Sequence, residues 1–330
     1  MNMERRKIVF DVAAVGEVLI DFTPAGNDAC GDRLFVRKPG GAPANVLAAV
    51  SKLGGRTAFI GKIGNDMFGS FLKETLDHLG IDTSGLAVDK TIHTTLAFVQ
   101  LDDRGDRSFS FYRNPGADVR LEAGEIPQDV ISQSHMLHFG SVSLTDEPSR
   151  SATLHAVNIA KKAGCIISFD PNYRPPLWRD TQEAKAQMMA GLSMADIVKV
   201  SEEEMVLLTG KTDLEEGSFE LGKYGAALVL VSLGAQGAFF RRGDFTSRVP
   251  TYDVKTVDTN GAGDAFLGAV NFCIKECSLN DLSALSKQDL EEIVSFANAA
   301  GALTTSKNGA IPAMPTVGEI ENCRKNISLL

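Results

Sequence analysis

The sequence has few cysteines and no disulfide pattern. Its 330 residues include an odd number of scattered cysteines, which are Cys30, Cys165, Cys273, Cys277 and Cys323. This arrangement is unlike a disulfide framework and favours a reducing compartment, which we expect to be the cytoplasm. Cys273 and Cys277 lie one helical turn apart, but no further metal ligands lie near them in sequence. We therefore expect packed or surface thiols at these positions.

Long apolar runs and an excess of positive charge are also missing. No stretch approaches ~18 uninterrupted apolar residues, the length of a membrane-spanning helix. The basic segment Met1–Lys7 is followed by an apolar run that Asp11 interrupts, so we expect no secretory signal peptide. Acidic residues outnumber basic ones by 42 to 33, and the formal net charge is −9. We therefore expect neither a membrane partner nor a nucleic-acid partner.

Short apolar runs alternate with helical stretches along most of the chain. The predicted strands are Ile8–Val15, Ala58–Ile60, Met136–Phe139, Ile166–Phe169, Ile197–Val200 and Ala227–Val231. The predicted helices are Ala44–Leu53, Phe68–Leu79, Ser149–Ala163, Gln182–Met194, Glu202–Leu208 and Phe219–Tyr224. This α/β alternation indicates a doubly wound, mainly parallel sheet flanked by helices on both faces. No repeat or linker divides the chain, so we expect a single domain over residues 1–330.

Two β-rich segments interrupt this alternation. Thr94–Leu101 and Ser108–Tyr112 flank a predicted hairpin turn at 102–106, and Arg33–Arg37 is another short extended piece. We expect a small β-sheet lid, formed from about residues 22–39 and 92–118. Its free apolar face can bury against a second copy, which predicts a homodimer through the lid. The alternative is a surface excursion without a role.

The junction at residues 258–264 reads Asp-Thr-Asn-Gly-Ala-Gly-Asp, and an apolar run follows directly. Gly261 and Gly263 at a helix start let backbone N–H groups converge on one point, where the helix dipole adds positive potential. An anion can bind there, and Asp264 beside it can take a proton from an attacking group. The helix N-terminus should keep this carboxylate ionised, so we expect a weak base. The pattern indicates phosphoryl transfer to a hydroxyl group.

Other turns that follow predicted strands have both a functional and a structural interpretation. Arg174 can clamp a phosphate with its planar guanidinium, or the turn can be a local one capped by Asp170. Ser201 and Glu204 fit a helix capping box, and Glu204 can also orient a hydrated Mg²⁺. Both interpretations of this pair can hold together.

Paired glycines mark two more positions where a ligand can approach the backbone. Gly40 and Gly41 precede Pro43 at the start of a predicted helix, which suits either ligand approach or a plain loop-to-helix turn. The turn from Gly234 to Gly237 can form a flat shelf for a nucleotide, or can be a simple hairpin.

Two familiar nucleotide motifs are excluded. A P-loop does not fit because too many residues separate Gly55 from Gly61, and Ile63 replaces the hydroxyl residue. A dinucleotide fingerprint fails because Phe266 occupies the position of its third glycine, and the segment lies far from the first βα unit. A nicotinamide-dependent dehydrogenase is therefore not supported.

Together, three glycine-rich motifs resemble those of the ribokinase-like (PfkB) carbohydrate kinase family. They are Gly40-Gly41-x-x-Ala44-Asn45, Gly61-x-x-Gly64-x-Asp66-x-x-Gly69 and Asp258-Thr259-x-Gly261-Ala262-Gly263-Asp264, and the resemblance spans residues 8–315. Within the family the chain is most similar to fructokinases. The residues that carry this narrower match lie at 111–118, 170–178 and 196–201.

The resemblance implies ATP-dependent transfer of the γ-phosphoryl group to the 6-hydroxyl of D-fructose, giving fructose 6-phosphate and ADP. The alternatives are a 2-keto-3-deoxygluconate kinase or a riboside or nucleoside kinase of the same family. A non-catalytic sugar sensor is less favoured, because Asp264 and both glycines of the nest are intact.

The resemblance also implies roles for single residues. Asp264 would be the catalytic base, with Gly261, Ala262 and Gly263 as the anion hole. The sugar would be held by Asp21, Gly40, Gly41, Asn45, Arg113, Arg174 and Asp264. ATP would contact Ser201, Ser232, Gly234, Gly237, Gly263 and Asn298. Glu204 would hold Mg²⁺, directly or through water, while Asp258 and the carbonyl of Asn260 would bind a monovalent cation, which we expect to be K⁺. Many members have threonine at position 260 and asparagine at position 201, and the second departure weakens the implied Mg²⁺ site.

Overall fold

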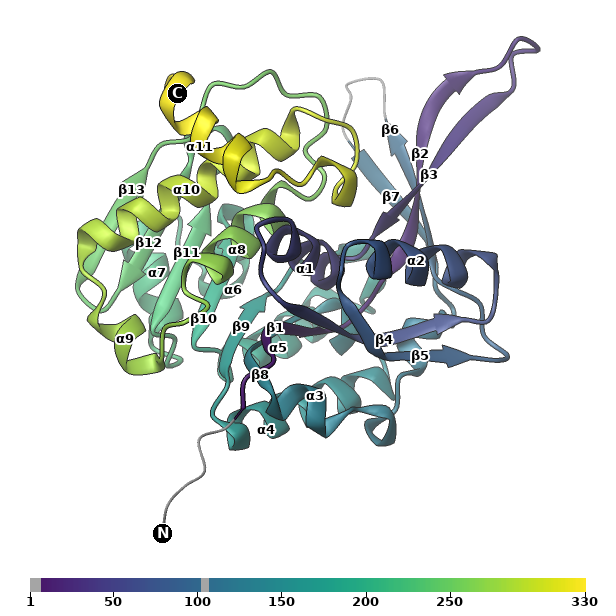
Figure 1. The fold of residues 1–330 in the computed structure, drawn as a ribbon, viewed down its shortest axis with the longest axis horizontal. Helices are drawn as coiled ribbons and strands as arrows, with labels where there is room; N and C mark the ends of the chain where they lie inside the picture. The colour runs from purple at the N-terminus through teal and green to yellow at the C-terminus, as the bar shows by residue number, and fades with distance from the viewer. Residues whose placement is uncertain (1–6, 102–106) are drawn as a thin grey trace.

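The computed structural model describes residues 7–101 and 107–330, so the turn expected at 102–106 lies outside the described part (Figure 1). Its main feature is a nine-stranded sheet with the order β13-β12-β11-β10-β9-β8-β1-β4-β5. The strands are β1 (Phe10–Val15), β4 (Thr57–Gly64), β5 (Asp82–Asp89), β8 (Ser134–Gly140), β9 (Ile166–Asp170), β10 (Ile197–Ser201), β11 (Leu228–Ser232), β12 (Ala238–Arg242) and β13 (Phe245–Val249). All neighbours pair in parallel except β11–β12 and β12–β13. The prediction of a doubly wound, mainly parallel sheet is confirmed.

Helices cover both faces of this sheet. One face packs against α1 (Ala42–Lys52), α2 (Met67–His78), α8 (Ala262–Cys273), α9 (Leu279–Ala284), α10 (Lys287–Thr305) and α11 (Val317–Asn326). The other packs against α3 (Gln128–Ser132), α4 (Ser149–Ala163), α5 (Thr181–Leu192), α6 (Glu202–Thr209) and α7 (Leu214–Gly222). Successive strand residues alternate between the two cores: Val12 belongs to one and Ala13 to the other. A strand buried on both sides must be apolar throughout, which explains the short unbroken apolar runs.

Several elements differ from the prediction. Strand β5 was missed because it is partly polar, and β2 (Leu19–Asn27) was expected only as part of the lid region at about 22–39. Helix α7 begins five residues before the predicted start at Phe219, because Asp213 caps it by accepting a hydrogen bond from the Glu216 N–H. Short 3₁₀ turns lie at Ala117–Arg120, Ala123–Glu125, Val142–Leu144, Pro175–Leu177, Gly234–Gln236 and Ile311–Ala313.

A second sheet, the lid sheet, lies beside the main one. It has the order β3-β2-β6-β7, with β3 at Arg33–Gly40, β6 at Leu96–Leu101 and β7 at Arg107–Tyr112. The β2–β3 hairpin extends away from the body of the molecule as an arm (Figure 1). Asp21 pairs with Lys38 on one side and Ala97 on the other, and Ala97 pairs with Phe111. Because paired residues share a face, these side chains all lie on one side of the lid sheet.

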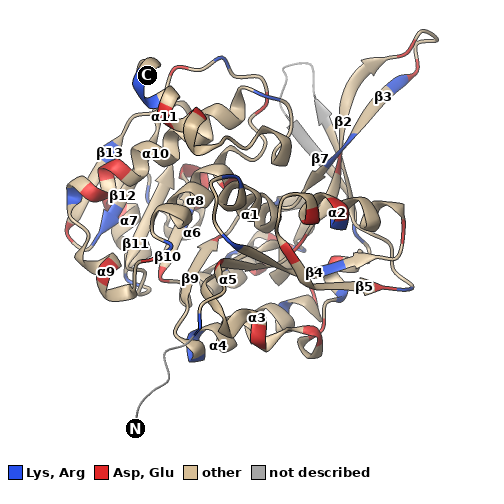
Figure 2. Ribbon diagram, viewed as in Figure 1, with Lys and Arg blue, Asp and Glu red and all other residues tan. Residues whose placement is uncertain are grey.

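The charge distribution agrees with the composition. Figure 2 shows basic and acidic residues interspersed over the described elements, without a stripe of one sign in that view. Among the described residues, every helix is too short or too polar to cross a bilayer.

Candidate active site

Three adjoining cavities lie where the carboxyl ends of strands β1, β9, β10 and β11 meet the N-termini of α1 and α8. This edge of a parallel sheet is the usual position for a ligand. We call the first the central pocket, and its polar lining is Glu17, Asp21, Asn45, Asn172, Arg174, Asn260 and Asp264. The second, the outer cavity, has a volume of about 610 Å³ and is lined by residues that include Lys199, Ser201, Glu204, Gly261, Gly263 and Asp264. The third, the apolar cavity, measures about 380 Å³ and is lined by residues that include Ser232, Gly234, Gly237, Tyr252, Phe266 and Asn298.

The cavities adjoin one another at residues that they share. Asp264 and Arg174 line both the central pocket and the outer cavity. Gly263 lines both the outer and the apolar cavity. A ligand in the apolar cavity can therefore extend through the outer cavity toward a second ligand in the central pocket, with Asp264 at the junction.

The segment predicted to form an anion nest is the start of α8. Gly261 is the N-cap and has a left-handed backbone with φ of 78°, which glycine adopts without strain. The N–H groups of the first helical turn, which includes Ala262 and Gly263, have no carbonyl within the helix to accept them. A Cβ at position 263 would lie 2.9 Å from Lys199 Nζ, so glycine here lets the helix start approach an ammonium group. Amides and a cation thus face the same space.

Asp264 is held in a defined orientation at the junction. Its Oδ2 accepts a hydrogen bond from Asn45 Nδ2 at 2.8 Å, and its Oδ1 accepts one from Asn172 Nδ2 at 3.1 Å. Burial raises the pKa of this carboxyl, while the Asn45 hydrogen bond and the charges of Lys199 and Arg174 act in the opposite direction. The helix N-terminus alone predicts a weak, ionised base, whereas burial of this side chain acts toward a more basic carboxylate.

Lys199 and Asp170 form a buried ion pair beside the nest. Lys199 Nζ lies 2.9 Å from Asp170 Oδ2, and both side chains are almost completely buried. Burial lowers the pKa of Lys199, but the carboxylates of Asp170 and Glu204 outweigh it and raise the pKa. Lys199 therefore keeps its charge at neutral pH and supplies positive potential to the outer cavity.

Of the predicted sugar-site residues on and after β2 and β3, Asp21 and Gly41 line the central pocket, and Gly40 packs directly behind Asp21. Asp21 lies so close to Gly40 that a Cβ there would collide with its carboxylate, which explains the glycine. Gly41 has φ of 109°, and its Cβ would meet the Glu17 carbonyl oxygen at 2.5 Å. Burial raises the pKa of Asp21 to about 6.

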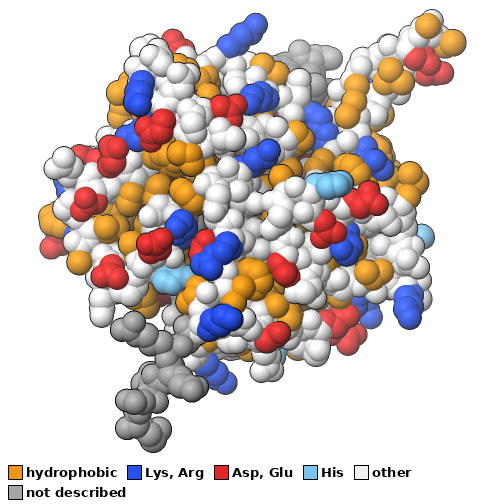
Figure 3. All heavy atoms as spheres, viewed as in Figure 1, with side chains coloured by type: hydrophobic (Ala, Val, Ile, Leu, Met, Phe, Trp, Pro, Cys, Tyr) orange, Lys and Arg blue, Asp and Glu red, His pale blue; other side chains and the backbone are white. Residues whose placement is uncertain are grey.

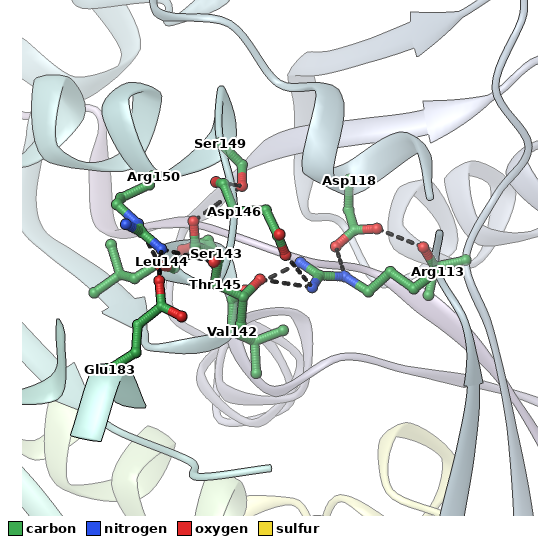
Figure 4. A network of polar contacts seen from close by, with 11 residues as sticks. Arg113, Asp118, Val142, Ser143, Leu144, Thr145, Asp146, Ser149, Arg150 and Glu183 are labelled. Atoms are coloured by element: carbon green, nitrogen blue, oxygen red, sulfur yellow. Dashed lines mark hydrogen bonds and ion pairs between the residues drawn. The ribbon is translucent and has the colours of Figure 1, made fainter. Parts of the chain in front are cut away.

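Arg113 does not line the central pocket, contrary to the prediction. Figure 4 shows its guanidinium turned toward the 3₁₀ turn after β8. Its Nε donates to Asp118 Oδ2 at 2.7 Å, Nη1 to Thr145 Oγ1 at 2.8 Å and Nη2 to the Val142 carbonyl at 3.0 Å. These bonds engage every nitrogen of the guanidinium, so Arg113 anchors the segment after β7 to the main body. Arg174, in contrast, does line the central pocket.

The residues predicted to contact ATP gather around the other two cavities. Ser232, Gly234, Gly237 and Asn298 line the apolar cavity, while Ser201 lines the outer one. Gly237 has φ of 88° and lies against the Val249 carbonyl, so a side chain would not fit. Asn298 Nδ2 donates to the carbonyls of Val249 and Pro250 at 2.9 and 3.0 Å, which fixes that wall.

Comparison with known proteins identifies this arrangement. The sequence matches the description "pfkB family carbohydrate kinase" over residues 9–317. The chain belongs to the pfkB family of carbohydrate kinases. It is 45% identical over 312 residues to Fructokinase-1 of Zea mays, covering 94% of this chain and 96% of the maize protein. It resembles Xylella fastidiosa fructokinase with bound ATP at a TM-score of 0.89 and 34% identity, covering 96% of this chain and 99% of that one. Vibrio cholerae fructokinase in its fructose, ADP and calcium ion bound form gives a TM-score of 0.84 at 37% identity, covering 94% of this chain and 98% of that one.

As a pfkB-family kinase, the protein is a phosphotransferase that acts on a sugar hydroxyl, and Glu204 is its predicted Mg²⁺ residue. Both oxygens of Glu204 accept backbone N–H groups, from Tyr173 at 2.7 Å and from Ser201 at 2.8 Å. The predicted capping box is therefore present. Among the described residues, no three acidic, histidine or cysteine side chains gather into a metal cage. Mg²⁺ commonly keeps several waters and is bound through one or two carboxylates plus substrate phosphates, so a carboxylate such as Glu204 on the outer cavity suits it.

The predicted monovalent-cation residues lie behind the nest of this pfkB-family site. Asp258 accepts hydrogen bonds from the N–H groups of Asn260 at 2.8 Å and Gly309 at 2.9 Å, which join two distant segments. Lys38 Nζ lies 4.0 Å from the same carboxylate. The buried carboxylate and the backbone carbonyls of these segments are oxygen ligands of the type that K⁺ accepts, although Lys38 already places positive charge nearby.

Sequence reasoning missed three site residues: Glu17, Asn172 and Lys199. Lys199 left a signal, because a lysine in the middle of the buried strand β10 requires a partner. Asn172 follows β9 and has a left-handed backbone with φ of 50°, which is uncommon outside glycine. Glu17 gave no signal that distinguishes it from an ordinary loop residue.

Proposed function

We propose that the protein is an ATP-dependent fructokinase that phosphorylates the 6-hydroxyl of D-fructose. The observation that carries the proposal is the Asp264 carboxylate, which two amide side chains hold at the junction of a polar pocket and an anion nest. Maize Fructokinase-1 is a relative of this chain, and the solved structure of the related Vibrio cholerae fructokinase contains fructose and ADP.

In this proposal, fructose occupies the central pocket and ATP extends from the apolar cavity into the outer one. Asp264 orients the sugar hydroxyl and accepts its proton. Phosphoryl transfer has a loose transition state, so positioning and charge stabilisation contribute most of the rate. The N–H groups at the start of α8, with Lys199 and Arg174, face the charge on the transferred group.

The cofactors in this proposal are Mg²⁺ and K⁺. Glu204 would hold Mg²⁺ through water, and the ion would neutralise charge on the ATP phosphates. Asp258 and the carbonyl of Asn260 would bind K⁺ and so keep the start of α8 in place. Relatives with bound calcium and potassium ions support cation binding.

We further propose that the lid sheet closes over the sugar and joins two copies into a homodimer in the cytoplasm. Asp21 and Phe111 lie on the lid face that lines the central pocket, so movement of this sheet would expose or cover the sugar. Closure would exclude water and limit wasteful ATP hydrolysis. The edge strand β3 leaves apolar side chains exposed, as a surface that pairs with another copy would.

Replacing the base tests the proposed chemistry. Asp264→Asn should lower kcat for fructose by at least ~10², because a positioned general base contributes ~10²–10⁴ to the rate. The measurement is coupled ADP release with Mg²⁺ and K⁺ present. Asp196→Asn is the control: this carboxylate accepts the Ile167 N–H, away from the site, and its loss should leave kcat unchanged. Near-full turnover by the Asp264 variant would refute the assignment.

A sugar panel separates the alternatives. Initial rates on fructose, 2-keto-3-deoxygluconate, ribose and a nucleoside should be highest on fructose. A higher kcat/KM on one of the others would reassign the acceptor within the family. Sugar binding without ADP formation from any of them would instead indicate a sensor.

A further inference from the structure

Glu17 lies at the base of the central pocket, in the loop that joins β1 to β2. Its side chain is buried, with 3% of the residue exposed, and lines the pocket together with Asp21 and Asn45. Its Oε1 accepts a hydrogen bond from the Ala42 N–H at 2.9 Å, at the first residue of α1. One oxygen of this carboxylate therefore caps the helix that carries Asn45.

The second oxygen is buried without a donor. Among the described residues, no hydrogen-bond donor reaches Glu17 Oε2, and Asn45 Oδ1 is unpaired as well. Burying an unpaired carboxylate oxygen destabilises a fold, so such atoms normally have partners. Both residues that carry an unpaired acceptor contribute to the lining of the central pocket.

Two other buried carboxylates of this chain accept hydrogen bonds on both oxygens, whereas Glu17 accepts one on Oε1 only. Glu204 also accepts backbone N–H groups near the site, and both of its oxygens are used. Asp11 accepts the Arg56 N–H on Oδ2 and the Arg56 guanidinium on Oδ1. A residue that served only as a helix cap would gain by pairing or exposing its second oxygen, and Glu17 does neither.

Among the described residues, no side-chain cation forms an ion pair with Glu17, although Arg174 lines the same pocket. Arg113, whose charge acts to lower the pKa of Glu17, is paired with Asp118 at 2.7 Å, so its effect on Glu17 is largely cancelled. Burial raises the pKa of Glu17 to about 7, as expected for a carboxyl without an ion-pair partner. The pocket also contains Asp21 and Asp264, so it offers many acceptors, and a molecule with several hydroxyl donors complements it.

We propose that Glu17 is a further sugar-binding residue, whose Oε2 accepts a hydrogen bond from a substrate hydroxyl other than the one that Asp264 activates. This proposal rests on the proposed sugar-kinase function. A site with a buried acceptor rejects analogues that lack the matching hydroxyl, because the acceptor then stays unpaired. Glu17 thereby selects sugars that carry a hydroxyl at one position.

The test combines one substitution with a series of deoxy sugars. Glu17→Gln keeps an oxygen for the Ala42 N–H but replaces the unpaired acceptor with a donor. We expect the KM for fructose to rise at least ~10-fold, with kcat within about 3-fold of wild type, since a hydrogen bond to a charged group contributes this much affinity.

The deoxy series shows whether the effect is local. Wild-type protein should bind one monodeoxyfructose at least ~10-fold more weakly than fructose, and Glu17→Gln should abolish that particular penalty while the others remain. Such coupling between one side chain and one hydroxyl does not arise from a general loss of stability. If the variant keeps the wild-type KM, or if every deoxy penalty persists unchanged, Glu17 is a helix cap and the proposal is wrong.

A matched control and a second variant complete the experiment. Asp11→Asn also removes a buried carboxylate that accepts a backbone N–H, but at the other end of β1, and it should leave KM and every deoxy penalty unchanged. If Glu17→Gln does not fold, Glu17→Asp, which keeps the charge but withdraws it from the pocket, must weaken the same penalty.

Failure of the proposed function is distinguishable from failure of this proposal. If the proposed function is wrong, wild-type protein releases no ADP with fructose. Calorimetry on the panel sugar that binds best then replaces the kinetic assay. Glu17→Gln must weaken binding of that sugar and remove the penalty for one of its deoxy analogues, or the proposal is wrong.

Discussion

Asp21 and Glu17 are buried carboxylates whose pKa values are raised by burial, so the site holds charge where the fold disfavours it. Asp21 illustrates the consequence. Its pKa rises from an ordinary 3.8 to about 6, so the folded protein binds this proton more tightly than the unfolded chain does. The unfolding free energy therefore falls as the pH rises from about 3.8 through about 6, and the loss is complete at neutral pH.

Asp21→Asn should accordingly stabilise the sugar-free protein but raise its KM for fructose. At pH 7.5 we expect the unfolding free energy to rise by ~1–3 kcal/mol, and the KM for fructose to rise at least ~10-fold because a sugar acceptor is lost. Thermal unfolding at pH 7.5 and at pH 4 measures the first effect, which should shrink at the lower pH.

Asp11→Asn is a control for which we expect the opposite change in stability. Burial would raise the pKa of Asp11, but its hydrogen bonds to Arg56 outweigh burial and lower it, so this carboxylate stabilises the fold at neutral pH. Its loss should lower Tm at pH 7.5. A fall in Tm for Asp21→Asn as well would mean that its carboxylate is stabilised by contacts that outweigh burial.

At the scale of elements, the packing of α1 against α8 sets the geometry of the site. Helix α1 carries Asn45 and helix α8 carries Asp264, and these side chains are hydrogen-bonded. Gly268 lets the two helices approach closely: a Cβ there would lie 2.6 Å from Ala49 Cβ and 2.8 Å from the Val46 carbonyl oxygen. Because one obstacle is backbone, a larger residue must push the helices apart.

Gly268→Ala should therefore reduce both stability and turnover. We expect a loss of ~1–3 kcal/mol from overpacking, and a fall in kcat of ~10-fold or more as Asp264 moves from its hydrogen-bonded position. Thermal unfolding and ADP release measure the two effects. Gly318→Ala in α11, where a Cβ would meet nothing within 4 Å, should change neither. Wild-type kcat in the Gly268 variant would show that the site tolerates a change in helix spacing.

At the scale of the whole molecule, the arm formed by β2 and β3 exposes apolar residues that a single copy of the chain does not bury. Leu34, Phe35 and Val36 are 45%, 39% and 46% exposed. Figure 3 shows hydrophobic side chains along this arm, which stands clear of the body. Phe35 contacts Phe98, which in turn contacts Tyr112, so aromatic residues continue across the lid sheet. Exposed apolar residues on an edge strand favour pairing with another chain.

Light scattering tests the predicted homodimer. Wild-type protein should have twice the chain mass, and Leu34→Asp with Val36→Asp should reduce it to the monomer, because charge on both residues opposes burial. Val317→Asp, at an apolar residue 38% exposed on α11, should leave the mass unchanged. A wild-type monomer at micromolar concentration would contradict the prediction.

The amino-acid sequence by itself determined the parts of this protein that depend on neighbours along the chain. Alternating apolar runs and helices specify the doubly wound sheet, because strands buried on both faces must be apolar throughout. The segment 258–264 predicts an anion nest, because glycines and an acidic residue at a helix start act within one turn. Partly polar strands such as β5 were missed, since their burial depends on what packs against them.

The tertiary structure alone decided which distant side chains meet. Asn172 and Asn45 reach Asp264 from β9 and α1, and Lys199 lies beside Gly263 because β10 ends next to α8. Arg113 was expected at the sugar, but Val142 and Thr145, far along the chain, bind its guanidinium. The physical reason is that burial, and hence pKa and hydrogen-bond pairing, is a property of the folded surroundings and not of local sequence.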